Sequence, residues 1–123
     1  MKVIYVAGPY RSHKPGGAQV NIQNAWRVAL EVWGMGAAAI CPHANTAHMD
    51  APGFEDAATY LDGDIEIMRR CDAVVLMEGW QQSEGAKREA REAIKAGTPV
   101  FHSLDEVRDF VYKSQDSQAD GEK

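Results

Sequence analysis

The chain opens with Lys2-Val3-Ile4-Tyr5-Val6-Ala7-Gly8-Pro9-Tyr10, an apolar run rich in β-formers that ends at a glycine-proline pair. A short apolar run bounded by turn residues predicts a strand buried within a sheet. Similar runs follow at residues 37–41, where Pro42 stops the strand, and at residues 73–77 and 99–101. The opening strand is therefore the first member of a series, and the segments between the strands decide how the sheet is built.

Helical patterns separate these strands. After the first strand, Asn21 is suited to cap a helix that ends at Gly34 and Gly36. Apolar residues recur along this helix with helical spacing, which predicts that they face the core. They are Ile22, Ala25, Trp26, Ala29, Leu30 and Trp33. We therefore expect the two tryptophans to be core residues and not a stacking platform for a ligand.

Three more helices complete the alternation. One spans about residues 59–70, the next begins at Ser83 and ends near Gly97, and the last begins at a capping box of Ser103 and Glu106. Residues 43–58 show no periodicity and predict a long loop. Strands that alternate with helices predict an α/β fold, in which right-handed crossovers place a parallel sheet of about four to five strands between helices on both faces.

Length and composition limit what the chain does. Its 123 residues allow one domain, which we place at residues 1–112, and the polar residues 113–123 are expected to be a disordered tail. A net charge of −5 argues against binding polymeric nucleic acid or an anionic membrane surface. No apolar run is long enough for a signal peptide or a membrane span. Cys41 and Cys71 both lie in apolar segments, which is typical of buried thiols in a reducing compartment, so a cytoplasmic location is expected.

The loops after the strands are where a ligand is expected. In an open parallel sheet, ligands bind beyond the carboxyl ends of the strands. The polar and aromatic residues at these ends make up the candidate binding set, and Trp80 is placed to stack on a base. The set is Gly8, Pro9, Tyr10 and Arg11 after the first strand, His43 and Asn45 after the second, and Trp80 after the third. The alternative is that these are ordinary connecting loops.

Two carboxylates stand out against the helical pattern. Asp64 falls in the middle of the apolar stripe of the second helix, where an ionised carboxylate costs several kcal/mol unless it is paired or its pKa rises. Glu89 lies at the edge of the apolar side of the third helix, near the same strand ends. Two carboxylates facing one site are what glycosidic bond cleavage requires. The alternatives are a backbone-capping or arginine-pairing role for Asp64 and a boundary position for Glu89.

The start of the third helix is a candidate anion site. Ser83 and Gly85 would give a phosphate a hydroxyl and close access to the free N–H groups of the first helical turn. A plain N-cap is the alternative.

The sequence gives little support for a metal site or for a bound organic cofactor. Cys41, His43, His48 and Asp50 match no zinc spacing, and the chain contains neither a GxGxxG turn nor a Walker A loop, so we expect no metal and no organic cofactor.

Taken together and in this order, the motifs resemble the nucleoside 2-deoxyribosyltransferase superfamily. The matching segments are Ala7-Gly8-Pro9-Tyr10, Tyr60-Leu61-Asp62-Gly63-Asp64 ahead of Asp72-Ala73-Val74-Val75-Leu76, and Ser83-x-Gly85-x-x-x-Glu89-Ala90. The similarity covers residues 2 to 101. It implies a three-layer, flavodoxin-like or Rossmann-like sheet, a small nucleoside or nucleotide as substrate, and a homo-oligomer whose subunits complete one another's sites.

The resemblance also implies roles for the residues that match. Glu89 takes the position of the nucleophile that attacks C1′, Asp64 that of the carboxylate that assists the departing base, and Tyr10 lies in the loop that orients the nucleophile and the sugar. Where members acting on unphosphorylated nucleosides carry an aspartate, this chain has Ser83. Serine at that position is typical of members that hydrolyse nucleoside 5′-monophosphates, since a second anion would repel the phosphate. Glu84 argues against this unless its side chain turns to solvent.

The resulting hypothesis is an N-glycosidase, or a base-exchanging transferase, that acts on a (2′-deoxy)nucleoside 5′-monophosphate. A non-catalytic nucleotide-binding or sensor module on the same fold is the first alternative, and a structural or interaction domain is the second.

Overall fold

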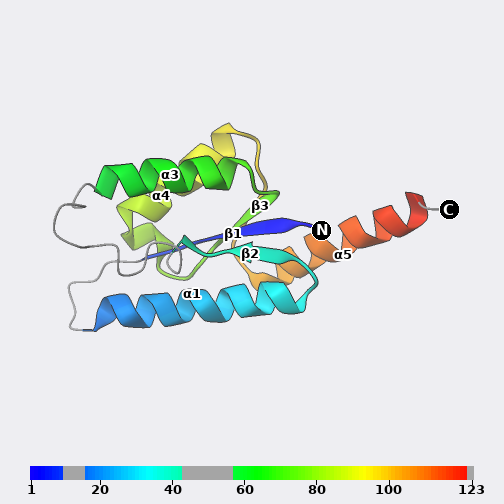
Figure 1. Cartoon of the computed structure of the whole chain (residues 1–123), viewed down its shortest axis with the longest axis horizontal. Coiled ribbons are helices and arrows are strands. Elements are labelled where there is room, and N and C mark those ends of the chain that lie inside the picture. Colours follow the sequence, from blue (N-terminus) through cyan, green and yellow to red (C-terminus); the bar gives the residue numbers. More distant parts are fainter. Residues whose placement is uncertain (10–15, 43–56, 122–123) are drawn as a thin grey trace.

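The computed structural model describes residues 1–9, 16–42 and 57–121. Strands and helices alternate along the chain (Figure 1), and the predicted α/β fold is confirmed. The strands are β1 (Val3–Ala7), β2 (Ala38–Ile40), β3 (Ala73–Leu76) and β4 (Val100–Phe101). The helices are α1 (Gly17–Gly34), α3 (Ala57–Arg69), α4 (Glu84–Lys95) and α5 (Leu104–Gly121), with a short 3₁₀ helix, η1, at Trp80–Gln82.

The strands form one 4-stranded parallel sheet in the order β2-β1-β3-β4. The opening strand β1 lies inside this sheet, with Ile4 beside Ala39 of β2 on one edge and beside Ala73 of β3 on the other. A strand between two neighbours, with helices on both faces, has no edge exposed to water. This position explains why the sequence of β1 is apolar without alternation.

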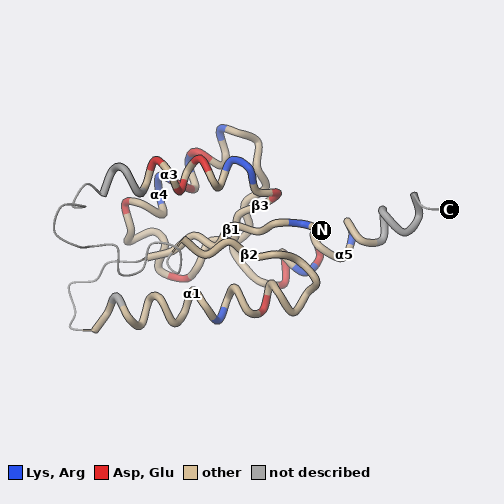
Figure 2. The backbone as a smooth tube through the Cα atoms, in the orientation of Figure 1, with Lys and Arg blue, Asp and Glu red and all other residues tan. Residues whose placement is uncertain are grey.

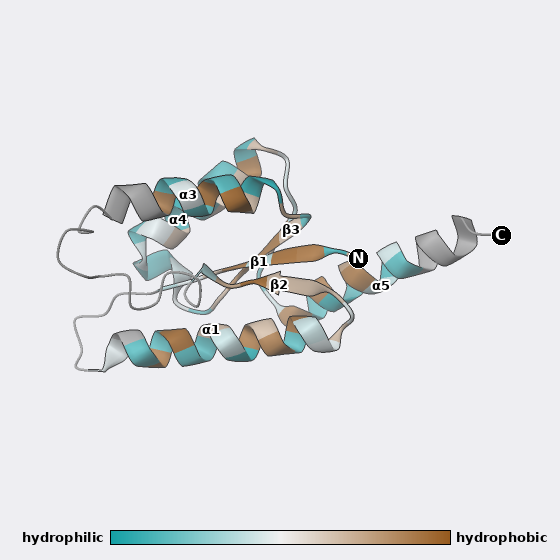
Figure 3. Ribbon diagram, viewed as in Figure 1, coloured by the Kyte–Doolittle hydropathy of each residue, from teal (hydrophilic) through white to brown (hydrophobic). Residues whose placement is uncertain are grey.

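Helices cover both faces of the sheet, as Figures 1 and 3 show. Alternate residues of β1 point to opposite faces. Ile4 and Val6 join the core beneath α1 and α5, whereas Tyr5 and Ala7 join the core beneath α3 and α4. The two cores therefore have the sheet between them, and Tyr5 and Ala7 are the buried residues of β1 on the side of α4. None of the helices among the described residues is long and apolar enough to cross a membrane.

Helix α1 differs from the sequence prediction in its start and in the face that it buries. It begins at Gly17, because Gly16 takes a left-handed conformation with φ 71° and turns the chain into the helix one turn before Asn21. The residues facing the core are Ile22, Ala25, Ala29 and Val32. The expectation that Trp26, Leu30 and Trp33 lie in the core is wrong, because all three are exposed. The helix carries two adjacent apolar stripes, and the one with small alanines allows α1 to lie close to the sheet.

Helix α5 is longer than expected. It continues to Gly121, past Tyr112, where we placed the end of the domain. Its core contacts, Val107 and Val111, lie before that point. The helix continues because residues 113–120 contain neither glycine nor proline, so the backbone propagates without needing an apolar face.

Candidate active site

The candidate site lies where β1 and β3 end. The N–H of Met77 donates to the carbonyl of Ala7, which extends the pairing of the two strands to their ends. Gly8 then passes so close to Met77 that a Cβ atom on it would lie 2.8 Å from the Met77 Cβ. Gly79 has φ 87°, and a Cβ atom there would lie 3.6 Å from the Pro9 ring. The lack of a side chain at Gly8 and Gly79 therefore allows the loops after β1 and β3 to lie close together.

Glu89 is the most unusual side chain of the site. It projects from α4 into the core beneath that helix and is only 6% exposed, the one buried charged residue among those that the structure describes. The pKa of Glu89 is raised to about 7, chiefly by burial, while the hydroxyl of Tyr5 acts to lower it and the negative charge of Asp64 adds to the rise. The sequence placed Glu89 at the edge of the apolar stripe. In the structure it is inside that stripe.

Asp64 comes from α3 and is half-buried. Burial raises its pKa to about 6. Its charge acts on both Glu89 and Tyr5, which shows that all three groups lie near one another. The two carboxylates singled out in the sequence therefore meet in one cluster, brought together by two helices that pack on the same face of the sheet.

Tyr5 is a further member of the cluster that was not among the residues predicted for the site. It is fully buried in β1, and its phenol reaches the carboxylate of Glu89. Burial, followed by the charge of Glu89, raises the pKa of this phenol, so it stays protonated and can donate a hydrogen bond. The Tyr5 hydroxyl and Glu89 Oε2 nevertheless lack a fully formed hydrogen bond to any described residue. A hydroxyl within an otherwise apolar buried strand is the signal that would have identified Tyr5, since such a group needs a polar partner.

The start of α4 has the features of an N-terminal anion site. Ser83 is the N-cap, and its Oγ accepts a hydrogen bond of 3.2 Å from the N–H of Ala86. Gly85 packs against α3, where a Cβ atom would lie 3.7 Å from Leu61 Cδ1. Glu84 turns to solvent, with its side chain 86% exposed and 2.7 Å from Lys87 Nζ. The pKa of Glu84 is lowered, first by that hydrogen bond from Lys87. Its charge is therefore directed away from the core and paired with a cation.

Trp80 follows β3 in η1 and is half-buried. It packs against the core beneath α3 and α4, and its ring lies 5.9 Å from that of His102 at an angle of 52°. Tyr10, Arg11, His43 and Asn45 lie outside the described residues, as do most members of the metal set considered above. Within the described part of the chain, no group of at least three His, Cys, Asp or Glu residues is placed to hold a metal ion.

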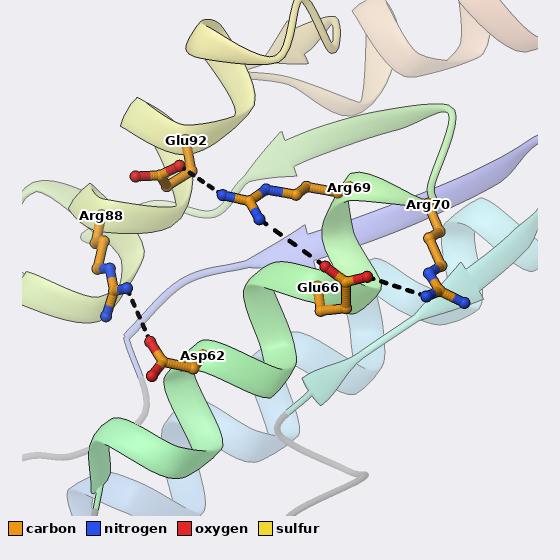
Figure 4. Close-up of polar contacts among 6 residues, drawn as sticks. All are labelled: Asp62, Glu66, Arg69, Arg70, Arg88 and Glu92. Atoms are coloured by element: carbon orange, nitrogen blue, oxygen red, sulfur yellow. Dashed lines mark hydrogen bonds and ion pairs between the residues drawn. The ribbon is translucent and has the colours of Figure 1, made fainter.

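Ion pairs join the two helices that carry the carboxylates (Figure 4). Arg88, directly before Glu89, contacts Asp62 at 2.8 Å. Further along, Arg69 contacts Glu92 at 3.0 Å, and Glu66 lies within reach of the same arginine at 3.9 Å. The pairs lie on the outer side of α3 and α4, so they connect the helices without entering the cluster of Tyr5, Asp64 and Glu89.

A protein-family model matches residues 2–103, from β1 through β4. The chain belongs to the DUF7768 family. That family is a domain of unknown function, so membership assigns no activity to this DUF7768 domain. A search of curated proteins found no match.

The DUF7768 domain shares its fold with two solved 2-deoxyribosyltransferases. The enzyme from the psychrotolerant bacterium Bacillus psychrosaccharolyticus is 16% identical with a TM-score of 0.56, and the match covers 80% of this chain and 69% of the enzyme. The enzyme from Leishmania mexicana is 23% identical with a TM-score of 0.56, and the match covers 81% of this chain and 62% of the enzyme. The resemblance predicted from the sequence is thus confirmed at the level of the fold.

Proposed function

We propose that this DUF7768 domain cleaves the N-glycosidic bond of a (2′-deoxy)nucleoside 5′-monophosphate. The observation that carries the proposal is the buried cluster of Glu89, Asp64 and Tyr5 beside the ends of β1 and β3. A fold has little reason to bury two neighbouring carboxylates with no basic partner among the described residues, because burial destabilises the ionised form of each and the charge of Asp64 adds to this effect at Glu89. Perturbed carboxylates at the ligand-binding edge of a parallel sheet are typical of a catalytic pair.

The proposed reaction divides the work between the two carboxylates. Ionised Glu89 attacks C1′ of the sugar, so a C–O bond forms as the C–N bond to the base breaks and the base leaves with the bonding electrons. Asp64, with a pKa of about 6, assists the departing base by donating a proton. Water then attacks C1′, its oxygen forms the new C–O bond as the ester bond to Glu89 breaks, and its proton returns to Asp64. A second nucleobase in place of water gives transfer, and Ser83 favours hydrolysis.

Tyr5 is proposed as the group that positions the nucleophile. Its hydroxyl stabilises the ionised form of Glu89 and thereby opposes the effect of burial. Tyr10, in the loop after β1, is proposed to orient Glu89 and the sugar. Gly8, Pro9, Arg11, His43, Asn45 and Trp80 are the proposed contacts to the rest of the nucleotide.

The start of α4 is proposed to receive the 5′-phosphate. Its helix dipole and the free N–H groups of its first turn favour an anion. The orientation of Glu84 supports this proposal, because an anion at that point would otherwise be repelled. The side chain points to solvent and pairs with Lys87.

Incubation with a panel of ribo- and deoxyribonucleoside 5′-monophosphates and their parent nucleosides tests the proposal, with free base measured by chromatography. We expect base release from a nucleotide, lost in Glu89→Ala and strongly reduced in Asp64→Asn. Asp109→Asn, on the exposed side of α5, is the matched control and should retain activity. Full activity in Glu89→Ala overturns the assigned role. Binding of a nucleotide without release of base indicates a binding module instead.

A further inference from the structure

Helix α1 presents an apolar face to solvent. Trp26, Leu30 and Trp33 are 48%, 69% and 54% exposed. Their spacing of i, i+4 and i+7 places all three side chains on one stripe, which we call the α1 face. The neighbouring stripe of the same helix packs on the sheet through Ala25 and Ala29. A contiguous stripe of large apolar side chains, two of them tryptophans, marks an interaction surface.

The charges beside the α1 face are few and balanced. Arg27 and Glu31 are the only charged residues of α1, as Figure 2 shows. Each directly follows a residue of the α1 face, so both lie on the same flank of the stripe. Both are exposed, and neither has an ion-pair partner among the described residues. A surface with one positive and one negative charge is complementary to a second copy of itself.

The order of these residues selects one geometry. In an antiparallel helix pair related by a two-fold axis, residues equally far from the helix midpoint meet, and the same flank faces the same flank. Trp26 and Trp33 lie equally far from the point between Ala29 and Leu30, and Arg27 and Glu31 lie equally far from Ala29. The midpoint of the tryptophan pair and the midpoint of the charged pair differ by half a residue along the helix. This offset is smaller than the rise of one residue, about 1.5 Å, so one two-fold axis serves both pairs. In a parallel pair, Arg27 of one copy and Glu31 of the other copy would instead lie on opposite sides of the contact.

We propose that the α1 face pairs antiparallel with the α1 face of a second copy, Trp26 packing on Trp33 and Arg27 pairing with Glu31 across the two-fold axis. The three apolar side chains expose on the order of 300 Å² per copy, if a tryptophan can bury about 150–250 Å². A stable interface buries roughly 800 Å² per partner, so the residues that flank the α1 face must supply the remainder.

This contact is separate from the candidate active site. Helix α1 covers one face of the sheet, and the helices that carry Asp64 and Glu89 cover the other. Pairing through α1 therefore leaves the cluster of carboxylates accessible, and it differs from the site-completing contact that the resemblance implies. A test of the interface does not depend on whether the chain is an enzyme.

Sedimentation velocity across a concentration series tests the proposal. We expect a dimer whose dissociation constant rises on the order of tenfold or more in Trp26→Glu and in Trp33→Glu. Arg27→Glu and Glu31→Arg should each weaken the dimer, and the double variant Arg27→Glu/Glu31→Arg should restore it. Ile94→Glu is the control, because Ile94 is 68% exposed but stands on α4. A monomer at every concentration overturns the proposal, and so does equal weakening by Ile94→Glu.

Cysteine crosslinking tests the antiparallel geometry. Leu30→Cys lies next to the two-fold axis and should form a disulfide with its own copy. Trp26→Cys and Trp33→Cys should crosslink when mixed and not when oxidised separately. Crosslinking of each variant with itself would show a parallel pair and overturn the proposed geometry. The unchanged chain, with Cys41 and Cys71, controls for background oxidation, and far-UV circular dichroism verifies that each variant is folded.

Discussion

At the scale of single residues, Glu89 holds a position that costs the protein stability. Its usual pKa of 4.5 rises to about 7 in the folded chain. Between these values the folded state binds more protons than the unfolded state, so the stability contributed by this residue falls as the pH rises from 4.5 to 7. A side chain selected only for packing would not carry this penalty, and the penalty is consistent with a functional carboxylate.

The first prediction follows from this loss of stability as the pH rises. Glu89→Gln should stabilise the fold by up to about 3 kcal/mol above pH 7, since one pKa unit corresponds to about 1.36 kcal/mol. Near pH 4.5 and below, the two proteins should be about equally stable, because Glu89 is then protonated in both states. Urea unfolding at pH 4.5 and pH 8 measures the difference. A variant equally stabilised at both pH values would contradict the buried ionisable position of Glu89.

The second prediction concerns the neighbours of Glu89. Tyr5→Phe removes the hydroxyl that favours the ionised form, so the pKa of Glu89 should rise. Asp64→Asn removes a nearby negative charge, so the pKa of Glu89 should fall. NMR titration of the Glu89 side-chain carboxyl carbon reads both shifts without relying on turnover.

Tyr112→Phe, on the exposed side of α5, is the control for the tyrosine substitution and should leave the titration unchanged. Shifts of the same sign in Tyr5→Phe and Asp64→Asn would show that the two groups do not act on Glu89 in the way described. If the chain cleaves nucleotides through ionised Glu89, the acid limb of its pH profile should move with this pKa, upward in Tyr5→Phe and downward in Asp64→Asn.

At the scale of elements, the cluster depends on how α3 and α4 sit against each other. The side chains that join these helices are exposed, and exposed ion pairs are individually weak. The Asp62–Arg88 contact, with side chains 64% and 40% exposed, nevertheless joins the residue directly before Glu89 to the residue two positions before Asp64. We expect this contact to fix the position of α3 relative to α4 more than it contributes to the free energy of unfolding.

The third prediction measures that contact. A double-mutant cycle of Asp62→Ala and Arg88→Ala should give a coupling of about 0.2–1 kcal/mol in urea unfolding, decreasing at high salt. Swapping the charges with Asp62→Arg/Arg88→Asp should recover part of it. The Glu66–Arg70 pair is the control within one helix, because it does not join α3 to α4. A coupling of zero would mean that packing alone sets the position of the helices.

Elements also show how far the sequence predicts the structure. Each strand and each α-helix that the structure describes was predicted, because apolar runs and helical periodicity are local, whereas the short η1 was expected to be a loop. The face that α1 buries was not, because its two apolar stripes are equivalent in periodicity and the sheet selects the stripe with alanines. The place of Asp64 within an apolar stripe could be predicted, because it depends only on the periodicity of its own helix. The approach of Tyr5 to Glu89 could not be predicted, because it joins β1 to α4 and depends on the order of the strands.

At the scale of the whole molecule, the remaining question is where the folded unit ends. The sequence placed the boundary at residue 112, whereas α5 continues to Gly121. The core contacts of α5 end with Val111, and Gln115 approaches the turn that follows α1, its Nε2 lying 3.0 Å from where a Cβ atom on Gly36 would stand. Residues 116–123 read Asp-Ser-Gln-Ala-Asp-Gly-Glu-Lys, with one alanine as the apolar residue. Acidic side chains near a helix C-terminus interact unfavourably with its dipole.

The fourth prediction is therefore that a chain ending after Gln115 keeps its stability. We expect its Tm within about 3 °C of the full chain, since Ala119 is the one apolar residue among those removed and about 1 kcal/mol corresponds to roughly 4–8 °C in a small domain. Val111→Ala in the full chain is the comparison, because Val111 is 1% exposed and its truncation should cost about 1–3 kcal/mol. Thermal unfolding at one protein concentration separates the two. If the shortened chain lost as much as Val111→Ala, the last turns of α5 would have to be packing against something, and a loss that grew on dilution would identify it as a second copy of the chain.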